Sequence, residues 1–199
     1  MEFYNTIAQE GQAEFKDRGS KFIAYVFPIV TTNDVKKALA TLKKEHAKAV
    51  HHCFAYRIGL DGNQFRVSDD GEPSGTAGKP ILGQIDSKQV TNTCIAVVRY
   101  FGGTLLGVPG LIHAYKTAAS LVLQVVPVVQ KRVMRKYAVQ FDYTQMNDIM
   151  LVVKQLNGTV LRQEQQLFSG MDVEIPIMRV EEWVYRINNL RNVTISLLF

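Results

Sequence analysis

Residues 68–82 read SDDGEPSGTAGKPIL, and residues 99–119 read RYFGGTLLGVPGLIHAYKTAA. Together these two stretches hold seven of the chain's fourteen glycines. Glycine loses more backbone entropy on folding than any other residue, so such a density is expected where the chain turns sharply or where something approaches its backbone closely. The two stretches therefore indicate a structural or binding feature around which the rest of the chain is organised.

The second stretch predicts a strand, a glycine loop and a helix. Residues 92–101 are rich in β-branched and aromatic side chains, which favours a buried strand. Pro109 suits the first position of the helix that follows. The N–H groups of a helix start favour an anion, although the glycines could also serve only a tight turn with the nearby cations solvated. The residues predicted to contact an anion here are Gly102, Gly103, His113 and Lys116.

The first stretch matches neither of two common catalytic motifs. A Walker loop needs a glycine where Pro73 stands and a hydroxyl residue where Pro80 stands. The G-x-S-x-G spacing of a nucleophile elbow is absent around Ser74. Small residues leave their N–H groups accessible and a lysine supplies a point charge, which favours anion binding. The residues predicted to contact a ligand are Ser74, Gly75, Thr76, Gly78, Lys79 and Arg99.

Three acids in the first stretch, Asp69, Asp70 and Glu72, have two interpretations. One is a structural ion-pair cluster that faces Arg99 and holds the loop in place. The other is an active site in which an acid acts as base or metal ligand and Lys79 holds an anion. Both remain open, but no nucleophile and base occur at a recognisable spacing, so no catalytic residue is assigned.

These two strings are too specific to be treated as generic glycine loops. They resemble the YigZ/IMPACT family, whose hallmark is an SDDGEP-type loop with a GTAG-x-P continuation, followed by a VVRYFGG-x-x-LG strand and loop. The segment HHCFAYR at 51–57 and the order of elements extend the resemblance over essentially the whole chain. The chain departs from the family pattern at Pro109, which removes an N–H from the helix start, and at His113, which replaces a basic residue.

The resemblance implies an α+β fold in two domains. Residues 1–133 would resemble the second domain of ribosomal protein S-five, and residues 134–199 would form a ferredoxin-like domain resembling the fifth domain of elongation factor G. The residue pattern independently restarts after a proposed hinge at 125–131, and it reads as the β-α-β-β-α-β unit. The predicted strands are 137–142, 159–164, 172–177 and 193–199, and the predicted helices are 145–156 and 181–190, with Trp183 in the core.

The first 133 residues are predicted to begin with strands at 2–9, 13–17 and 21–30, which turn near Gly11 and Gly19. A helix capped by Asn33 or Asp34 follows, and then a hairpin of 53–58 and 64–68, and a short helix or irregular crossover at 81–89. One face of the first helix is basic, which is typical of either a solvated or a phosphate-facing surface. Its lysines are Lys36, Lys37, Lys43, Lys44 and Lys48, and Arg57 and Arg66 on the hairpin extend the basic surface.

Charge is unevenly distributed along a chain of ordinary globular composition. The net charge is +5, with 47% hydrophobic and 21% charged residues among 199. Up to Val133 there are 16 Lys and Arg against 11 Asp and Glu, whereas the remainder carries 7 of each. The basic excess of the first part predicts an acidic partner for it.

Cysteine and histidine content argues against a metal or redox site. Cys53 and Cys94 lie in apolar runs, which is typical of buried reduced thiols. His46, His51 and His52 lack the spacing of a zinc site, so no metal or cofactor is predicted. The N-terminus lacks a signal-peptide pattern and no apolar run reaches membrane-span length, so we expect a cytoplasmic protein that does not bind membranes.

Three functional hypotheses follow from these patterns. The leading one is a protein that binds RNA or the ribosome in translation or its regulation, which the basic first domain and the family resemblance favour. The alternative is an enzyme acting on a small phosphorylated or carboxylated substrate. A second alternative is a protein-binding translation regulator, because the resemblance extends to eukaryotic IMPACT proteins that control translation by binding other proteins.

Overall fold

The computed structural model describes residues 1–164 and 169–198. The chain divides into two compact units, which are described separately. The first is Tyr4–Lys131, and the second joins Met1–Phe3 to the chain from Arg132 onward. Each unit combines a β-sheet with helices, so the predicted two-domain α+β fold is confirmed.

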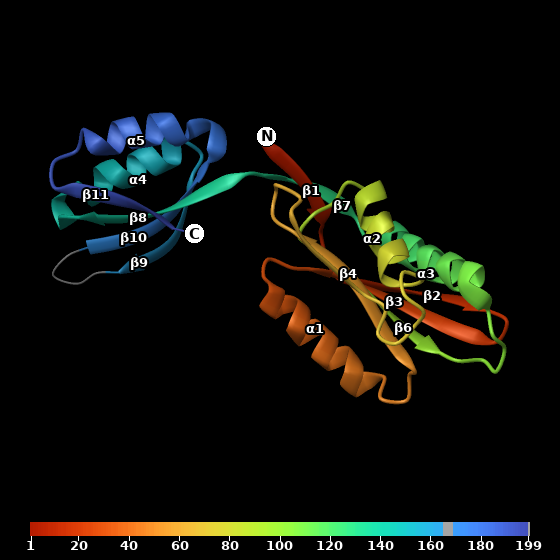
Figure 1. The fold of residues 1–199 in the computed structure, drawn as a ribbon. Coiled ribbons are helices and arrows are strands. Elements are labelled where there is room, and N and C mark those ends of the chain that lie inside the picture. The colour runs from red at the N-terminus through yellow and green to blue at the C-terminus, as the bar shows by residue number, and fades with distance from the viewer. Residues whose placement is uncertain (165–168, 199) are drawn as a thin grey trace. The chain divides into compact units, whose positions relative to one another are not determined.

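The first unit is built on a five-stranded antiparallel sheet with two unequally covered faces. Along each strand successive side chains point to opposite faces, so Phe22 and Val26 face one side while Tyr25 and Phe27 face the other. Helices α2 and α3 cover the first face, and α1 lies on the second (Figure 1). The sheet order is β2 (Gly11–Asp17), β3 (Ser20–Pro28), β6 (Thr93–Tyr100), β4 (His51–Ile58) and β5 (Gln64–Ser68), and the helices are α1 (Thr32–Glu45), α2 (Gly78–Ser87) and α3 (Gly107–Gln124).

The two faces differ in how much apolar surface they bury. The α2–α3 side holds the larger core, which includes the fully buried Phe22, Ile81 and Tyr115. The α1 side holds a smaller cluster around Val35 and Cys94. A single helix on a five-stranded face leaves part of that face uncovered.

The predicted order of strands and helices is confirmed here, but four details are wrong. The first strand, β1 (Phe3–Ile7), pairs with β7 (Val128–Arg132) and not with β2. The predicted hinge at 125–131 therefore contains a paired strand. Sequence patterning missed this pair because its strands are separated by almost the whole unit, and long-range pairing leaves no local signal.

The start of α1 also differs from the prediction. Its N-cap is Thr31, whose hydroxyl accepts the Asp34 N–H at 3.3 Å, while the Asp34 carboxylate accepts the Thr31 N–H at 2.8 Å. This reciprocal capping box satisfies two backbone donors, so Asp34 supports the cap from the third helical position. In α3, Pro109 occupies the third and not the first helical position, where its missing N–H still costs no intrahelical bond.

The second unit has the predicted β-α-β-β-α-β order. Its sheet runs in the order β11, β8, β10, β9, which is the ferredoxin-like arrangement, and all neighbours are antiparallel. Trp183 is fully buried in its core, as predicted. None of the helices in the described ranges is both long and apolar enough to span a membrane. The elements are β8 (Met134–Phe141), α4 (Met146–Gln155), β9 (Thr159–Glu164), β10 (Ser169–Pro176), α5 (Val180–Asn188) and β11 (Val193–Leu198), with short 3-10 turns at Tyr143–Gln145 and Ile177–Arg179.

Two glycines of the quoted stretches allow close approach of the protein's own backbone. A Cβ on Gly102 would lie 1.9 Å from the Gly19 carbonyl carbon in the β2–β3 turn. A Cβ on Gly78 would lie 2.7 Å from the Ser68 nitrogen at the end of β5. Backbone atoms cannot yield in the way that a flexible side chain can, so both positions exclude larger residues for structural reasons.

We expect Gly102→Ala to lower the free energy of unfolding by about 3 kcal/mol, because the β2–β3 turn must shift to admit a methyl group. Chemical denaturation followed by circular dichroism measures this change. The matched control is Gly83→Ala, because Gly83 is exposed in α2 and has no neighbour within 4 Å of its would-be Cβ. That control should be neutral or stabilising by up to about 1 kcal/mol. Equal denaturation midpoints for the Gly102 variant and the parent would contradict the packing argument.

Candidate functional site

The loop between β5 and α2 is organised around the carboxylate of Asp69. Its Oδ2 accepts the Gly75 N–H at 2.8 Å, and its Oδ1 accepts those of Ala77 at 3.0 Å and Gly78 at 2.8 Å. Ala77 is the N-cap of α2, so the anion position at this helix start is filled by the chain's own side chain. Burial alone would raise the pKa of Asp69, but these N–H donors outweigh it and hold the pKa below its ordinary value.

The second acid of the loop, Glu72, joins three elements in the protein interior. Its side chain is only 3% exposed. Its Oε1 accepts a hydrogen bond from Arg99 Nη1 of β6 at 2.6 Å and from the Tyr115 hydroxyl of α3 at 2.7 Å. Its Oε2 lies 3.8 Å from His51 Nε2 of β4. The two glycine-rich stretches therefore meet at Glu72.

A thiol and a phenol complete this buried cluster. The Cys53 thiol lies 2.9 Å from the Asp69 carbonyl oxygen, to which it can donate, and 3.3 Å from the Tyr115 hydroxyl. Burial raises the pKa of the Cys53 thiol and of the Tyr115 phenol well above their ordinary values. Both groups stay protonated at neutral pH, so Cys53 does not supply the thiolate that a nucleophile requires.

Two neighbouring histidines hold the same loop from β4. His51 Nδ1 lies 2.7 Å from the Asp70 carbonyl oxygen, which can only accept, so this nitrogen carries the proton. The His52 backbone N–H donates to Asp70 Oδ2 at 2.7 Å. Asp70 itself adopts a φ of +43°, a conformation that aspartate tolerates better than most residues. These bonds fix Asp70 as a structural residue of the turn.

The second glycine loop is also partly engaged by the protein. The Gly102 N–H donates to Ser20 Oγ at 3.1 Å. Gly103 is exposed, with a φ of +87°, and nothing lies within 4 Å of its would-be Cβ. Farther along α3, His113 and Lys116 are exposed and border a shallow hollow with Gln84 of α2. This end of the site remains accessible to solvent.

The predicted contact residues therefore fall into two groups. In the first, the polar groups are already used by the protein. Arg99 is buried with Glu72, Thr76 donates to the Pro73 carbonyl oxygen at 2.7 Å, and Arg57 pairs with Asp86 at 2.7 Å. This first group also includes the loop glycines Gly75, Gly78 and Gly102. The second group is exposed and consists of Ser74, Lys79, Gly103, Arg66, His113, Lys116, Lys36 and Lys43.

The exposed group does not converge on one pocket. Lys36 and Lys43 lie on α1, whereas Lys79 and Lys116 lie on α2 and α3, on the other face of the sheet (Figure 1). Of the two interpretations of the acids, the structure favours the ion-pair cluster, because the oxygens of Asp69 and Glu72 already accept internal donors.

Sequence reasoning missed the roles of Tyr115 and Cys53 in this cluster. Both residues lie on apolar faces of their elements, where a hydroxyl or thiol group is taken for part of an ordinary core side chain.

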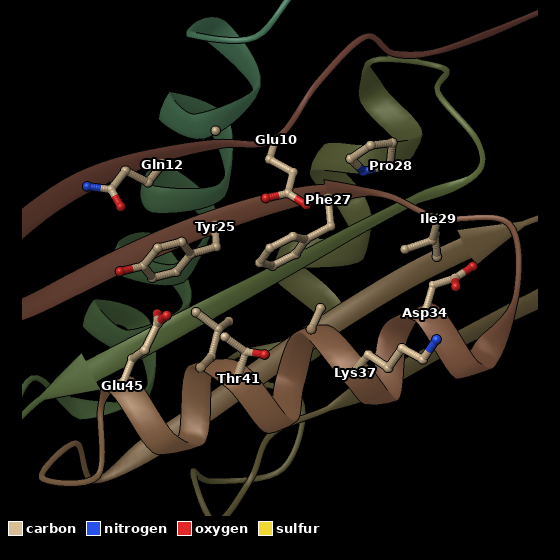
Figure 2. A pocket seen from close by; sticks show the side chains of 13 residues that line it. Glu10, Gln12, Tyr25, Phe27, Pro28, Ile29, Asp34, Lys37, Thr41 and Glu45 are labelled. Atoms are coloured by element: carbon tan, nitrogen blue, oxygen red, sulfur yellow. The ribbon is translucent and has the colours of Figure 1, made fainter.

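Sequence reasoning also missed a groove between α1 and the strands β2 and β3, which is shown in Figure 2. The sequence did contain a signal for an apolar surface on this side of the sheet. Tyr25 and Phe27 alternate with Ala24 and Val26, so β3 is apolar on both faces.

Comparison with known proteins gives matches over the whole chain. Residues 18–123 match the Impact N-terminal domain. The IMPACT family member YigZ of Escherichia coli is 33% identical over 90% of this chain and 89% of its own length. The IMPACT family member YvyE of Bacillus subtilis is 38% identical over 73% of this chain and 67% of its own. A crystal structure of a hypothetical protein, 31% identical, superposes with a TM-score of 0.77 and covers 100% of this chain and 97% of that one.

We expect Glu72→Gln to lower the free energy of unfolding by about 3 kcal/mol or more, because it leaves the Arg99 guanidinium buried without a counter-charge. Denaturation of Glu72→Gln, Arg99→Met and the double variant measures the coupling between the two side chains. The double variant should lose about 2 kcal/mol less than the two single losses combined. The control is Glu182→Gln, which removes an exposed partner of Arg179 and should cost less than about 1 kcal/mol. Additive losses at Glu72 and Arg99 would refute the coupling.

We expect Asp69→Asn to cost about 2 to 3 kcal/mol at neutral pH, because hydrogen bonds to a carboxylate are lost. The pKa of Asp69 is lower in the folded state than in the unfolded state. The contribution of its carboxylate to the free energy of unfolding is therefore fully present at pH values above the unfolded-state pKa, and it is lost as the pH falls through the folded-state pKa. The difference in free energy of unfolding between parent and variant should therefore become smaller below about pH 4. Denaturation at a series of pH values measures it, with the exposed Asp148→Asn as control. A difference that stays constant down to the lowest pH would exclude this account.

Proposed function

This chain belongs to the IMPACT family, and from that premise we propose that it acts in translation or its regulation by binding RNA or the ribosome. The binding surface that we propose is the basic outer side of the first unit. Cationic side chains, and not the amides of the glycine loops, would make the phosphate contacts. The family resemblance supports the process, and the arrangement of charges on α1 supports the ligand class.

The observation that carries this proposal is a stripe of lysines on α1. Lys36, Lys43 and Lys44 are seven and eight positions apart, so the helical repeat places them on one side. All three are exposed, and none forms an ion pair with a residue that the structure describes. Uncompensated cations on one helix side provide the electrostatic attraction on which phosphate binding depends.

Arg66 of β5 extends this stripe. It lies opposite Tyr56 of β4 in the antiparallel register, so both side chains belong to the sheet face that carries α1. The helical repeat turns Lys36 and Lys43 toward the β4–β5 side of α1, away from β2 and β3. The proposed surface therefore runs from the outer side of α1 to the edge strand of the sheet.

The glycine loops have a smaller role in this proposal than the sequence predicted. The N–H groups of Gly75 and Gly78 already bind Asp69, and Arg99 already neutralises Glu72. The loops can still add peripheral cations, because Lys79 is exposed at the start of α2 and Lys116 is exposed on α3. Contacts of this kind position a nucleic acid without reading its bases.

The enzyme hypothesis finds less support in the geometry. It required Asp69, Asp70 or Glu72 as base or metal ligand, with Lys79 as anion clamp. Asp69 binds three amides and Glu72 is buried against Arg99, so a proton transfer by either acid would first break these bonds. The protein-binding hypothesis is favoured by a separate feature, the groove of Figure 2, and is argued below.

The test of the proposed function is the salt dependence of binding to single-stranded RNA. With about three phosphate contacts, the logarithm of the binding constant should fall with the logarithm of salt concentration with a slope of roughly −2. Replacing Lys36, Lys43 and Lys44 by alanine should weaken binding and make the slope clearly shallower, and the peripheral cations Arg66, Lys79 and Lys116 account for what remains. Filter binding with labelled RNA measures both quantities.

The matched control removes the same number of charges from other exposed sites. Lys88, Lys131 and Lys154 replaced by alanine give the same net charge, and they lie outside α1. This control should keep most of the parent slope. An equal loss in both triple variants would mean that only net charge matters, and a parent slope near zero would exclude phosphate binding.

A further inference from the structure

A groove of about 620 Å³ lies along one side of α1, between that helix and the strands β2 and β3 (Figure 2). It forms because α1 packs over β4 and β6 through Val35, Leu39 and Leu42, which leaves the β2–β3 part of the same face uncovered. Its volume lies within the range of pockets that bind ligands of drug size. None of the residues proposed to contact RNA lines it.

Aromatic side chains of β3 form the floor of the groove. Tyr25 and Phe27 stack with ring centroids 6.4 Å apart and an interplanar angle of 13°. The Tyr25 hydroxyl lies 2.7 Å from His46 Nε2, and His46 Nδ1 lies 2.8 Å from the Tyr100 hydroxyl. This chain of hydrogen bonds fixes the Tyr25 ring before any ligand arrives, so little side-chain entropy is lost on binding.

Carboxylates dominate the rim of the groove. Glu10, the residue before β2, lies beside Phe27, and Glu45 of the last turn of α1 lies beside Tyr25 (Figure 2). Both are exposed, whereas the third acid, Asp34, is already used by the capping box. Lys37 is the single cation of the lining and lies near Asp34 (Figure 2). Burial raises the pKa of Tyr25, and the nearby Glu45 carboxylate adds to this rise.

We propose that this groove docks a basic segment of a partner protein, with one arginine or lysine side chain over Tyr25 beside Glu45 and a second basic side chain beside Glu10. A cation over an aromatic face is attracted by the ring, and the neighbouring carboxylate adds Coulomb attraction. Apolar side chains of the same segment would cover Phe27. The same carboxylates repel phosphate, so the groove suits a basic protein segment and not RNA. The inference does not rest on RNA binding by the lysine stripe.

The helical repeat explains how one helix presents both surfaces. Asp34, Ala38, Thr41 and Glu45 recur at three- and four-residue spacing and line the groove. Lys36 and Lys43 lie on the β4–β5 side of the same helix, away from the groove, and Lys44 lies on its outer side. The two surfaces therefore have opposite charge and different chemistry, and variants of one can leave the other intact.

The test is an NMR titration of the full chain with an amphipathic helical peptide of leucine and arginine as long as α1, 14 residues. We expect chemical-shift changes at Gln12, Tyr25 and Thr41. The Glu10→Gln/Glu45→Gln variant should bind the peptide about tenfold more weakly, and its spectrum will report whether it is folded. The charge-matched control, Asp148→Asn/Glu181→Gln in the second unit, should retain the parent affinity within about twofold.

Three other ligands test which class of molecule the groove binds: a glutamate-containing peptide, an RNA oligonucleotide and an arginine amide. A peptide with glutamate in place of arginine should not shift the groove residues, and an RNA oligonucleotide should shift the α1 lysine stripe instead. Equal groove shifts by either ligand would overturn the proposal. So would an arginine amide that binds as tightly as the peptide, or a leucine–arginine peptide that leaves the groove unshifted at about 1 mM.

Discussion

The buried carboxylate of Glu72 is the interaction on which the arrangement of the first unit depends. It connects the β5–α2 loop to Arg99 of β6 and Tyr115 of α3, and so draws the two glycine-rich stretches together. Removing two charges from water is expensive, and such a pair stabilises little relative to an apolar replacement. The pair instead selects one conformation of the β5–α2 loop. Because Arg99 is buried beneath this loop, any other placement of the loop would leave the Arg99 charge buried without a partner. The Asp69 carboxylate does the same for the start of α2, where it occupies the place of an external anion.

The strands and helices of both units could be predicted from periodicity because that signal is local. Alternation along β6 and the β-α-β-β-α-β order after residue 134 each depend on neighbouring residues. Contacts that define the site are not local: Glu72 reaches Arg99 across 27 positions and Tyr115 across 43. The glycines correctly indicated a close backbone approach, but not which group approaches. At Gly102 that group is the protein's own β2–β3 turn, and no pattern within the stretch could reveal it.

The lysine-rich helix shows why a correct local pattern can still give an incomplete site. Its sequence suggested two sides, one apolar and one basic. In the structure α1 has a third side, because it covers only part of a five-stranded sheet face and leaves Tyr25 and Phe27 beside it. Whether a helix flank meets solvent or an open sheet is decided by sheet order, which places β2 and β3 at one edge. Glu45 on that side of α1 can be interpreted as part of a binding groove only once Tyr25 and Phe27 are known to lie beside it.

Two oppositely charged surfaces on one helix have a physical consequence for simultaneous binding. They are separated by about the diameter of a helix, 10 Å, which is close to the Debye length at physiological salt, about 8 Å. Screening therefore weakens their influence on one another without removing it. A phosphate backbone bound along Lys36 and Lys43 would add negative potential at the groove and favour a basic segment there. The coupling is reciprocal: the basic segment would favour RNA binding by the same free energy by which RNA favours binding of the segment. RNA and a basic protein segment would thus assist each other's binding to α1, more at low salt than at high, without any change in the fold.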